Sequence, residues 1–344
     1  MKKFNSKSCE EIMTTVYKPI EFVVDNLLAQ GLYILAGAPK VGKSWLALDM
    51  CLSIAKGEKV LGQQTTQGTA LYLCLEDSYV RIQNRLYEIT DEPAERLYFV
   101  IMSEAIGNGL EEQITDFKNE HYDLKVVFID TLQKVRNESE SGYGTDYKEL
   151  SVMKALADKL EITIVVVHHT RKCADSDPFN MISGSTGLSG CVDGSMVLIE
   201  SKRGSRTAKL HCVGRDIENA EINLQFDSNL KKWIVTDEPL NCKNKDNIFL
   251  AALYVYLKKH IDFCGTASEL VNVLKSVSDE TFYPNRVTRD LVRNGYTLRK
   301  YGIDFQYKRT RNGRLIILHY DRERDSSDGK NTIEVTVNKL IQKV

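Results

Sequence analysis

The sequence predicts an α/β fold with a mostly parallel central sheet, an antiparallel flank and a small second α+β domain. Three observations support this prediction. Apolar segments typical of buried strands alternate with helical segments through the first half of the chain. From Met196 onward, strand-like segments follow one another with no helices between them. A polar linker, Asp237 to Asp246, then precedes a shorter region with a different pattern.

The expected elements of the first domain can be read from apolar runs and their boundaries. Strands covered by helices on both faces are expected at Leu32–Ala36, Ala70–Leu75, Leu97–Ile101, Lys125–Asp130 and Ile162–Val167. Helices are expected at Trp45–Lys56, Tyr79–Glu88, Leu110–His121 and Asp146–Leu160. The later strands are expected at Met196–Ile199, Ala208–Val213, Glu221–Phe226 and Lys232–Val235. An extended segment, Tyr17–Asp25, is expected to lead into the first strand.

We expect residues 1–240 to form the first domain, with a lead-in over 1–30, and residues 323–344 to form a polar tail. Residues 245–322 are expected to form a winged-helix-like domain. Its helices are predicted at Ile248–Lys258, after a capping-box pattern that begins at Thr266, and from Pro284 to just before Gly295. Asn312-Gly313 between two further strands is a strong hairpin signal.

Composition limits the classes of protein that are possible. The 344 residues carry 46 Lys and Arg against 47 Asp and Glu, so any nucleic-acid surface must be local. The 8 cysteines are scattered without a C-x-x-C pair, which favours free thiols in a reducing compartment over a zinc site or disulfide framework. No apolar run is long enough for a membrane span. We therefore expect a soluble, cytoplasmic protein.

One motif carries the strongest chemical signal. Residues 37–44 fit the P-loop pattern G-x-x-x-x-G-K-[ST], between a predicted buried strand and a predicted buried helix. This arrangement turns backbone N–H groups and a helix N-terminus toward one point, where phosphates bind. Lys43 is expected to reach the β- and γ-phosphates, and Ser44 to bind Mg²⁺. The predicted nucleotide-binding residues are Gly37, Ala38, Pro39, Lys40, Val41, Gly42, Lys43, Ser44 and Trp45.

Polar residues at the ends of other predicted strands complete the candidate site. Asp130 follows four apolar residues and is expected to hold Mg²⁺ through water. Glu76 ends the second strand in the same way and could deprotonate an attacking water, although a helix cap or a solvated loop would also explain a carboxylate there. His168 and His169 end a further strand, and one of them could contact the γ-phosphate. Adjacent strand residues point to opposite faces, which argues against a metal-binding pair.

These motifs resemble the RecA-like ATPases of plasmids and phages, of the RepA hexameric helicase type related to DnaB. The resemblance rests on residues 31–48, 71–77 and 167–172, and it extends over roughly residues 15–235. Residues 184–190 resemble the second channel loop of that group, and Ser185 and Thr186 within it are the expected contacts to single-stranded DNA.

The resemblance implies a homohexameric ring with ATP and Mg²⁺ bound between subunits. It implies that Glu76 is the catalytic base, consistent with Thr131 standing where many other P-loop ATPases carry glutamate. It favours His169 over His168 as the γ-phosphate sensor. A cation from the neighbouring subunit would come from Lys202 or Arg203, which are adjacent here rather than separated by one residue. A primase or an initiator protein is a possible partner.

The predicted second domain is locally basic. Between Asn285 and His319 there are nine cations against Asp290 and Asp304. The cations are Arg286, Arg289, Arg293, Arg299, Lys300, Lys308, Arg309, Arg311 and Arg314. Arg286, Arg289 and Arg293 share one helical face, which predicts binding to duplex DNA; a solvated surface or a protein-docking face are the alternatives.

The sequence thus predicts an ATP-hydrolysing DNA motor, a ring-forming replicative helicase of a plasmid, phage or other mobile element. A second interpretation, from another class, is a non-motor ATP switch that binds duplex DNA as an initiator or regulator. A third and weaker interpretation is a small-molecule P-loop kinase, which would need a lid with arginines that act within one subunit.

Overall fold

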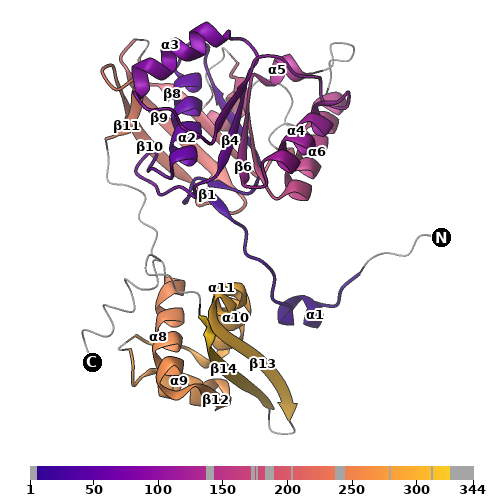
Figure 1. Ribbon diagram of the computed structural model, residues 1–344, viewed down its shortest axis with the longest axis vertical. Helices are drawn as coiled ribbons and strands as arrows, with labels where there is room; N and C mark the ends of the chain where they lie inside the picture. The colour runs from indigo at the N-terminus through magenta and orange to yellow at the C-terminus, as the bar shows by residue number, and fades with distance from the viewer. Residues whose placement is uncertain are drawn as a thin grey trace, which may run out of the picture. The chain divides into compact units, whose positions relative to one another are not determined.

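The computed structural model describes residues 6–136, 143–171, 175, 177–182, 190–202, 204–236, 245–278, 280–310 and 313–325. The chain divides into two compact units, and each has an apolar core of its own (Figure 1). One unit is formed by Ile20–Asn241, and the other by Cys242–Val344 together with Met1–Pro19. The N-terminal segment is thus grouped with the second unit, which differs from the expected lead-in over residues 1–30.

The Ile20–Asn241 unit is built on a nine-stranded sheet in the order β11-β10-β9-β8-β3-β7-β6-β4-β5. The parallel strands are β3 (Gly31–Gly37), β4 (Thr69–Cys74), β5 (Leu97–Val100), β6 (Leu124–Asp130), β7 (Thr163–His169) and β8 (Gly194–Glu200). The antiparallel strands are β9 (Thr207–Gly214), β10 (Ala220–Asp227) and β11 (Lys232–Val235). The predicted α/β fold class is confirmed. The antiparallel flank begins at β9, one strand later than expected, because β8 runs parallel to β3.

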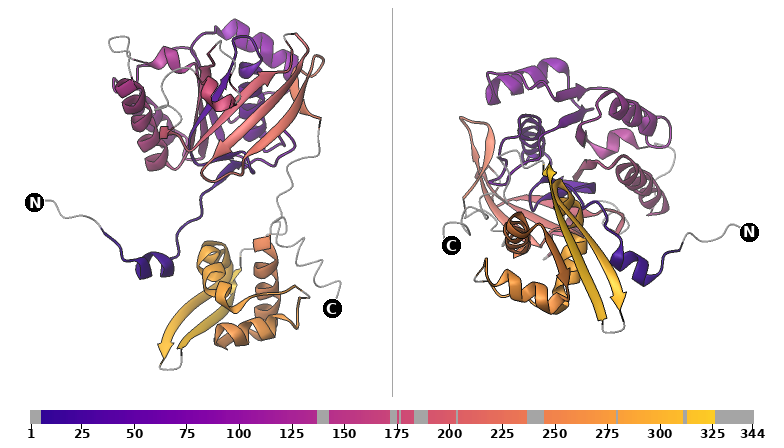
Figure 2. Two further views of the ribbon diagram at one scale, coloured as in Figure 1. Left: turned by 180° about the vertical axis from the view of Figure 1, so that it is seen from behind. Right: turned by 60° about the horizontal axis from the view of Figure 1, so that its bottom comes forward.

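Helices cover both faces of this sheet (Figure 2). The helices are α2 (Lys43–Lys56), α3 (Tyr79–Ile89), α4 (Leu110–Glu120), α5 (Leu132–Val135) and α6 (Tyr143–Leu160), with a 3₁₀ turn at Pro178–Met181. Residues of α2 and α3 share one apolar cluster with Tyr33 and Leu35 of β3. Residues of α4, α5 and α6 share another with Leu32 and Ile34. Successive side chains of β3 therefore enter opposite cores, as expected for a central strand.

The lead-in segment forms a small sheet separate from the main one. Strand β1 (Phe22–Val24) pairs antiparallel with β2 (Leu28–Ala29), just before β3 begins. Within the described ranges, no helix combines the length and the apolar character needed to cross a bilayer.

The second unit combines helices with a three-stranded antiparallel sheet in the order β12-β14-β13. Its elements are α1 (Cys9–Thr14), α8 (Lys245–His260), β12 (Asp262–Gly265), α9 (Ala267–Leu274), α10 (Pro284–Arg293), α11 (Gly295–Lys300), β13 (Tyr301–Thr310) and β14 (Gly313–Asp325). The predicted capping box is present, with Thr266 and Glu269 bonded reciprocally. Strand β14 extends to Asp325, past the expected boundary at residue 322.

Close packing explains why the N-terminal segment is grouped with this unit. The Val16 side chain lies against Gly295 at the start of α11. A Cβ built on Gly295 would stand 2.8 Å from both Val16 methyl carbons, so the contact requires glycine there.

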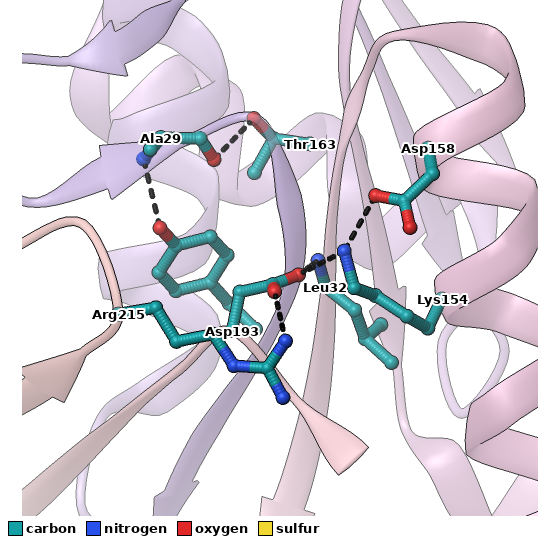
Figure 3. A network of polar contacts seen from close by, with 8 residues as sticks. Ala29, Leu32, Lys154, Asp158, Thr163, Asp193 and Arg215 are labelled. Atoms are coloured by element: carbon teal, nitrogen blue, oxygen red, sulfur yellow. Dashed lines mark hydrogen bonds and ion pairs between the residues drawn. The ribbon is translucent and has the colours of Figure 1, made fainter. Parts of the chain in front are cut away.

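A buried ionic network lies at the amino ends of the central strands, away from the P-loop (Figure 3). The Asp193 carboxylate is 5% exposed and accepts the Leu32 N–H at 2.8 Å. Lys154 of α6 and Arg215 lie 2.9 and 3.4 Å from its two oxygens. A Cβ on Gly31 would collide with this carboxylate, which explains glycine at the first position of β3. Asp193 thus joins β3, α6 and the segment after β9.

We expect Asp193→Ala to lower the free energy of unfolding of the first unit by about 3–5 kcal/mol, because it leaves a partly buried ammonium and a buried backbone N–H without their carboxylate. Urea unfolding followed by tryptophan fluorescence reports on this unit alone, because the 2 tryptophans, Trp45 and Trp233, both belong to it.

The matched control is Asp158→Ala, which removes the other carboxylate bonded to Lys154. The Asp158 side chain is 54% exposed, so its loss should cost about 1 kcal/mol or less. Equal effects of the two substitutions would show that the buried network does not hold the strands together.

Candidate active site

The P-loop lies between the end of β3 and the start of α2, and its shape depends on glycine. Gly42 occupies the N-cap position of α2 with φ 99°, a left-handed conformation that favours glycine. A Cβ on Gly42 would stand 3.0 Å from the Trp233 ring, and one on Gly37 would stand 2.7 Å from the Leu198 carbonyl oxygen. Neither position has room for a side chain, so the loop backbone stays open to a ligand at the helix N-terminus.

Lys43, the first residue of α2, is 6% exposed. Its ammonium donates to the carbonyl oxygens of Gly37 and Ala38 at 2.8 and 2.9 Å. Burial lowers the pKa of Lys43 from its ordinary value of 10.5 to about 8, although the nearby Asp130 and Glu76 carboxylates act in the opposite direction. The amine is thus folded back into the loop, where it can turn to a phosphate oxygen.

Ser44 and Asp130 face each other across the strand ends. The Ser44 hydroxyl donates to Asp130 Oδ2 at 2.7 Å, and the Tyr72 hydroxyl donates to the same oxygen at 2.9 Å. Asp130 stands at the end of β6, opposite Cys74 of β4. A hydroxyl and a carboxylate at this distance are the oxygen donors that suit Mg²⁺, so the residues present fit the expected metal. Burial and the adjacent Asp130 raise the pKa of Tyr72 well above its ordinary value, which keeps it a donor.

Glu76 lies at the same edge of the sheet, directly after β4. It is exposed, and Thr131 Oγ1 donates to its carboxylate at 3.2 Å. Thr131 itself is 3% exposed. The backbone there is held by a bond from Leu75 N to Asp130 O at 2.9 Å. A solvent-facing carboxylate bonded by a fixed hydroxyl is suited to receive a proton from a water molecule.

The two histidines at the end of β7 have different surroundings. His168 pairs in register with Ala36, and His169 with Gly37 at the start of the P-loop. His169 Nδ1 lies 3.4 Å from Lys43 Nζ, whereas His168 is buried with contacts of its own. Of the two, the structure brings His169 to the P-loop.

Several residues of the expected site lie outside the described part of the chain. These are Arg203 and the channel-loop residues Ser185 and Thr186. Lys202, next to Arg203, is described and exposed. Its turn is held by bonds from Gly204 N to Glu200 and from Lys202 N to Ser205.

Helix α10 presents a basic exposed face. Arg286, Arg289 and Arg293 are exposed, whereas Val287 and Leu291 on the opposite side are buried in the core of the second unit. The Arg286 guanidinium lies 5.5 Å from the Tyr283 ring centroid. Arg289 is bonded to its neighbour Asp290 at 2.9 Å, which offsets part of its charge.

Sequence reasoning missed two supports of the site. Tyr72 was hidden inside an apolar strand, where alternation along β4 could have placed it on the same face as Cys74. Trp233 donates from Nε1 to the Gly42 carbonyl oxygen at 3.2 Å, although 191 residues separate the two in sequence. No local pattern predicts a contact over that separation.

A glycine loop between a buried strand and a buried helix, a buried lysine, and a strand-end carboxylate that faces Ser44 define a P-loop ATPase domain. Comparisons with known proteins agree. The family described as an AAA domain matches residues 8–175. A solved structure of an isolated ATPase domain superposes with a TM-score of 0.51 at 13% identity, over 60% of this chain and 85% of that chain.

A DnaB-like replicative helicase, described together with its interactions with primase, gives a TM-score of 0.50 at 14% identity. The match covers 60% of this chain and 57% of that chain, so this protein spans less than two thirds of that helicase. The first unit therefore has the RecA-like fold of helicase-type ATPase domains.

The shifted pKa of Lys43 gives a pH dependence. Phosphate binding needs the charged ammonium, and the amine of the free protein loses its proton above pH about 8. The affinity for ADP should therefore fall as pH rises from about 7 to about 9.5, approaching tenfold per pH unit above the pKa. Isothermal titration calorimetry measures this directly.

Lys43→Ala is the control, because its weakened binding should show little dependence on pH over this range. An affinity of the unmodified protein that stays constant up to pH about 9.5 would contradict the lowered pKa.

Proposed function

We propose that the protein is an ATP-hydrolysing DNA motor, a ring-forming replicative helicase of a plasmid, phage or other mobile element, acting in the cytoplasm. The observation that carries the proposal is the convergence of Lys43, Ser44, Asp130, Glu76 and His169 at one edge of a RecA-like sheet. These residues supply a phosphate-binding cation, oxygen donors for a metal, a base and a sensor.

Each residue has a distinct role in this proposal. Lys43 exchanges its carbonyl partners for phosphate oxygens. Ser44 and Asp130 hold Mg²⁺, which supplies neutralisation of phosphate charge when it is bound with ATP. Glu76 orients and deprotonates the attacking water, with Thr131 fixing one of its oxygens. His169 lies close enough to Lys43 to respond to the γ-phosphate.

The proposed ring supplies what one subunit lacks. A cation from Lys202 or Arg203 of a neighbouring subunit would stabilise charge that develops on the transferred phosphate, an effect typically worth about 10³–10⁵ in rate. Residues 183–190, with Ser185 and Thr186, would line the ring channel and contact a single DNA strand. A primase or an initiator protein is the proposed partner in replication.

Glu76→Gln should bind nucleotide normally but turn over about 10²–10⁴ times more slowly, because the amide keeps the shape and cannot accept the proton. Steady-state ATPase assays measure the rate, and ADP titration checks binding.

Glu95→Gln is a matched control, since Glu95 is an exposed carboxylate elsewhere on the same unit. Normal turnover by Glu76→Gln would exclude Glu76 as the base.

We further propose that the second unit is a winged-helix domain that binds duplex DNA through α10. Its order of helix, strand, two helices and a β-hairpin supports this, as does the exposed basic face of Arg286, Arg289 and Arg293. Arginines bind phosphate oxygens in fixed geometry and keep their charge at any physiological pH.

Changing these three arginines to alanine should make the dependence of duplex binding on salt shallower. If each neutralises one phosphate, the slope of log affinity against log salt should change by about 2.7, from about 0.9 per contact. Fluorescence anisotropy of the full chain with a labelled duplex measures the slope.

The control is a variant in which Lys259, Lys275 and Arg322 are changed to alanine. They are exposed, lie on other elements of the same unit, and remove the same total charge. An equal change in slope for both variants would show that the unit's net charge, and not α10, governs binding.

A second candidate is a non-motor ATP switch that binds duplex DNA. The basic face of α10 favours it, because that face belongs to a unit separate from the ATPase domain. Strand-displacement assays with ATP distinguish the two functions, since a switch would bind duplex without separating its strands.

A further inference from the structure

The turn that carries Glu76 is anchored on both sides by backbone bonds. Leu75 N donates to Asp130 O at 2.9 Å, and Asp77 N donates to Cys74 O at 3.1 Å. Helix α3 then starts at Tyr79. The exposed Glu76 side chain therefore takes its position from the placement of this short strand-to-helix turn.

Asp77, the next residue, is tied to the body of α3. Arg85 Nη1 lies 2.6 Å from Asp77 Oδ2, and the Asp77 side chain is 11% exposed. Arg81, one turn earlier in the helix, lies 4.0 Å from the other oxygen and is 72% exposed. Ser78 occupies the N-cap position, but its side chain makes no capping bond. The Asp77–Arg85 ion pair is thus the close side-chain link between the turn and the helix.

Arg85 also joins the turn to the P-loop. Its guanidinium lies over the Trp45 ring, 5.8 Å from the centroid. The Trp45 ring contacts Phe226 at 6.2 Å, and Phe226 contacts Trp233 at 5.3 Å between centroids. Trp233 in turn donates to the Gly42 carbonyl oxygen. A continuous path of side chains therefore runs from the Glu76 turn to the phosphate loop.

Few apolar contacts fix α3 in place. Of its eleven residues, all described, Ile82 is the one that is buried, while Leu86 and Ile89 are partly buried against the core. The ion pair and the stacking contact of Arg85 therefore contribute strongly to the placement of this helix against α2.

We propose that Arg85 is a positioning residue for hydrolysis, which holds the Glu76 carboxylate at its working distance from the P-loop. The proposal rests on the proposed role of Glu76 as base. Arg85 acts through Asp77 and Trp45 and does not touch the nucleotide. A displacement of the base by about 1 Å can reduce turnover on the order of 100-fold, so a small shift of the turn has a large effect.

The test compares steady-state ATPase kinetics of the full chain with those of Arg85→Ala, Arg85→Lys and Asp77→Asn. Arg85→Ala and Asp77→Asn should lower kcat about 10- to 100-fold with little change in KM. Arg85→Lys should recover part of kcat, because the ammonium can still pair with Asp77. Arg81→Ala is the matched control, a neighbouring and more exposed arginine of α3, and should behave as the unmodified protein.

Combination with Glu76→Gln separates positioning from other roles. If Arg85 acts through Glu76, adding Arg85→Ala to Glu76→Gln should lower the residual rate no further. A raised KM with unchanged kcat would overturn the proposal in favour of nucleotide contact by Arg85. An equal loss in Arg81→Ala, or a further loss in the combined variant, would also overturn it.

Folding of each variant is checked by urea unfolding. If Arg85→Ala is unfolded, Asp77→Asn, which keeps the shape of the side chain, carries the same expectation. Failure of the proposed function is distinguishable, because normal turnover by Glu76→Gln alone would remove the base whatever Arg85 does.

Discussion

The candidate site depends on the alignment of parallel strands at their carboxyl ends. Gly37 of β3 pairs with His169 of β7, and Cys74 of β4 pairs with Asp130 of β6. Side chains from remote parts of the sequence therefore reach one edge of the sheet. A shift of a single residue in any of these pairings would turn the side chain to the opposite core. The buried apolar faces on both sides fix the register, and so the core also determines the chemistry.

The antiparallel flank contributes to the site by supporting the helices around it. Trp233 packs against Gly42, and its neighbour Lys232 forms an ion pair with Asp49 of α2 at 2.9 Å. Burial raises the pKa of the Asp49 carboxyl, and the adjacent Lys232 opposes that effect. The adjacent Lys231 also pairs with Glu88 of α3 at 3.3 Å. One short edge strand thus fastens both helices that carry or border the phosphate loop.

The parts predicted from sequence are those encoded locally. The P-loop pattern, the strand-end position of Asp130 and the capping box at Thr266 each lie within a few residues, and the elements predicted around them are present. Orientation was harder to predict. β8 reads as one of a series of strands without helices between them, yet its continuous burial is typical of a parallel strand covered on both faces.

Contacts between remote segments could not be predicted, because they depend on which strands become neighbours. The bond from Tyr72 to Asp130 follows from the pairing of β4 with β6, and the Asp193 network follows from the pairing of β3 with β8. Strand β12 has four residues, too few to show a period. Local sequence therefore specified the candidate site's chemistry, and the topology of the sheet specified its supports.

The chain recognises phosphate in two physically different ways if both proposals hold. Lys43 is buried, and its lowered pKa means that charging it costs free energy until a phosphate replaces the carbonyl oxygens around it. The arginines of α10 are exposed and always charged, so they attract a polyanion from solution but gain little from any one contact. Salt screens exposed charges far more than buried ones. Raised ionic strength should therefore weaken duplex binding at α10 while nucleotide binding at the P-loop changes much less, and the ATPase domain can stay loaded while its hold on duplex DNA varies.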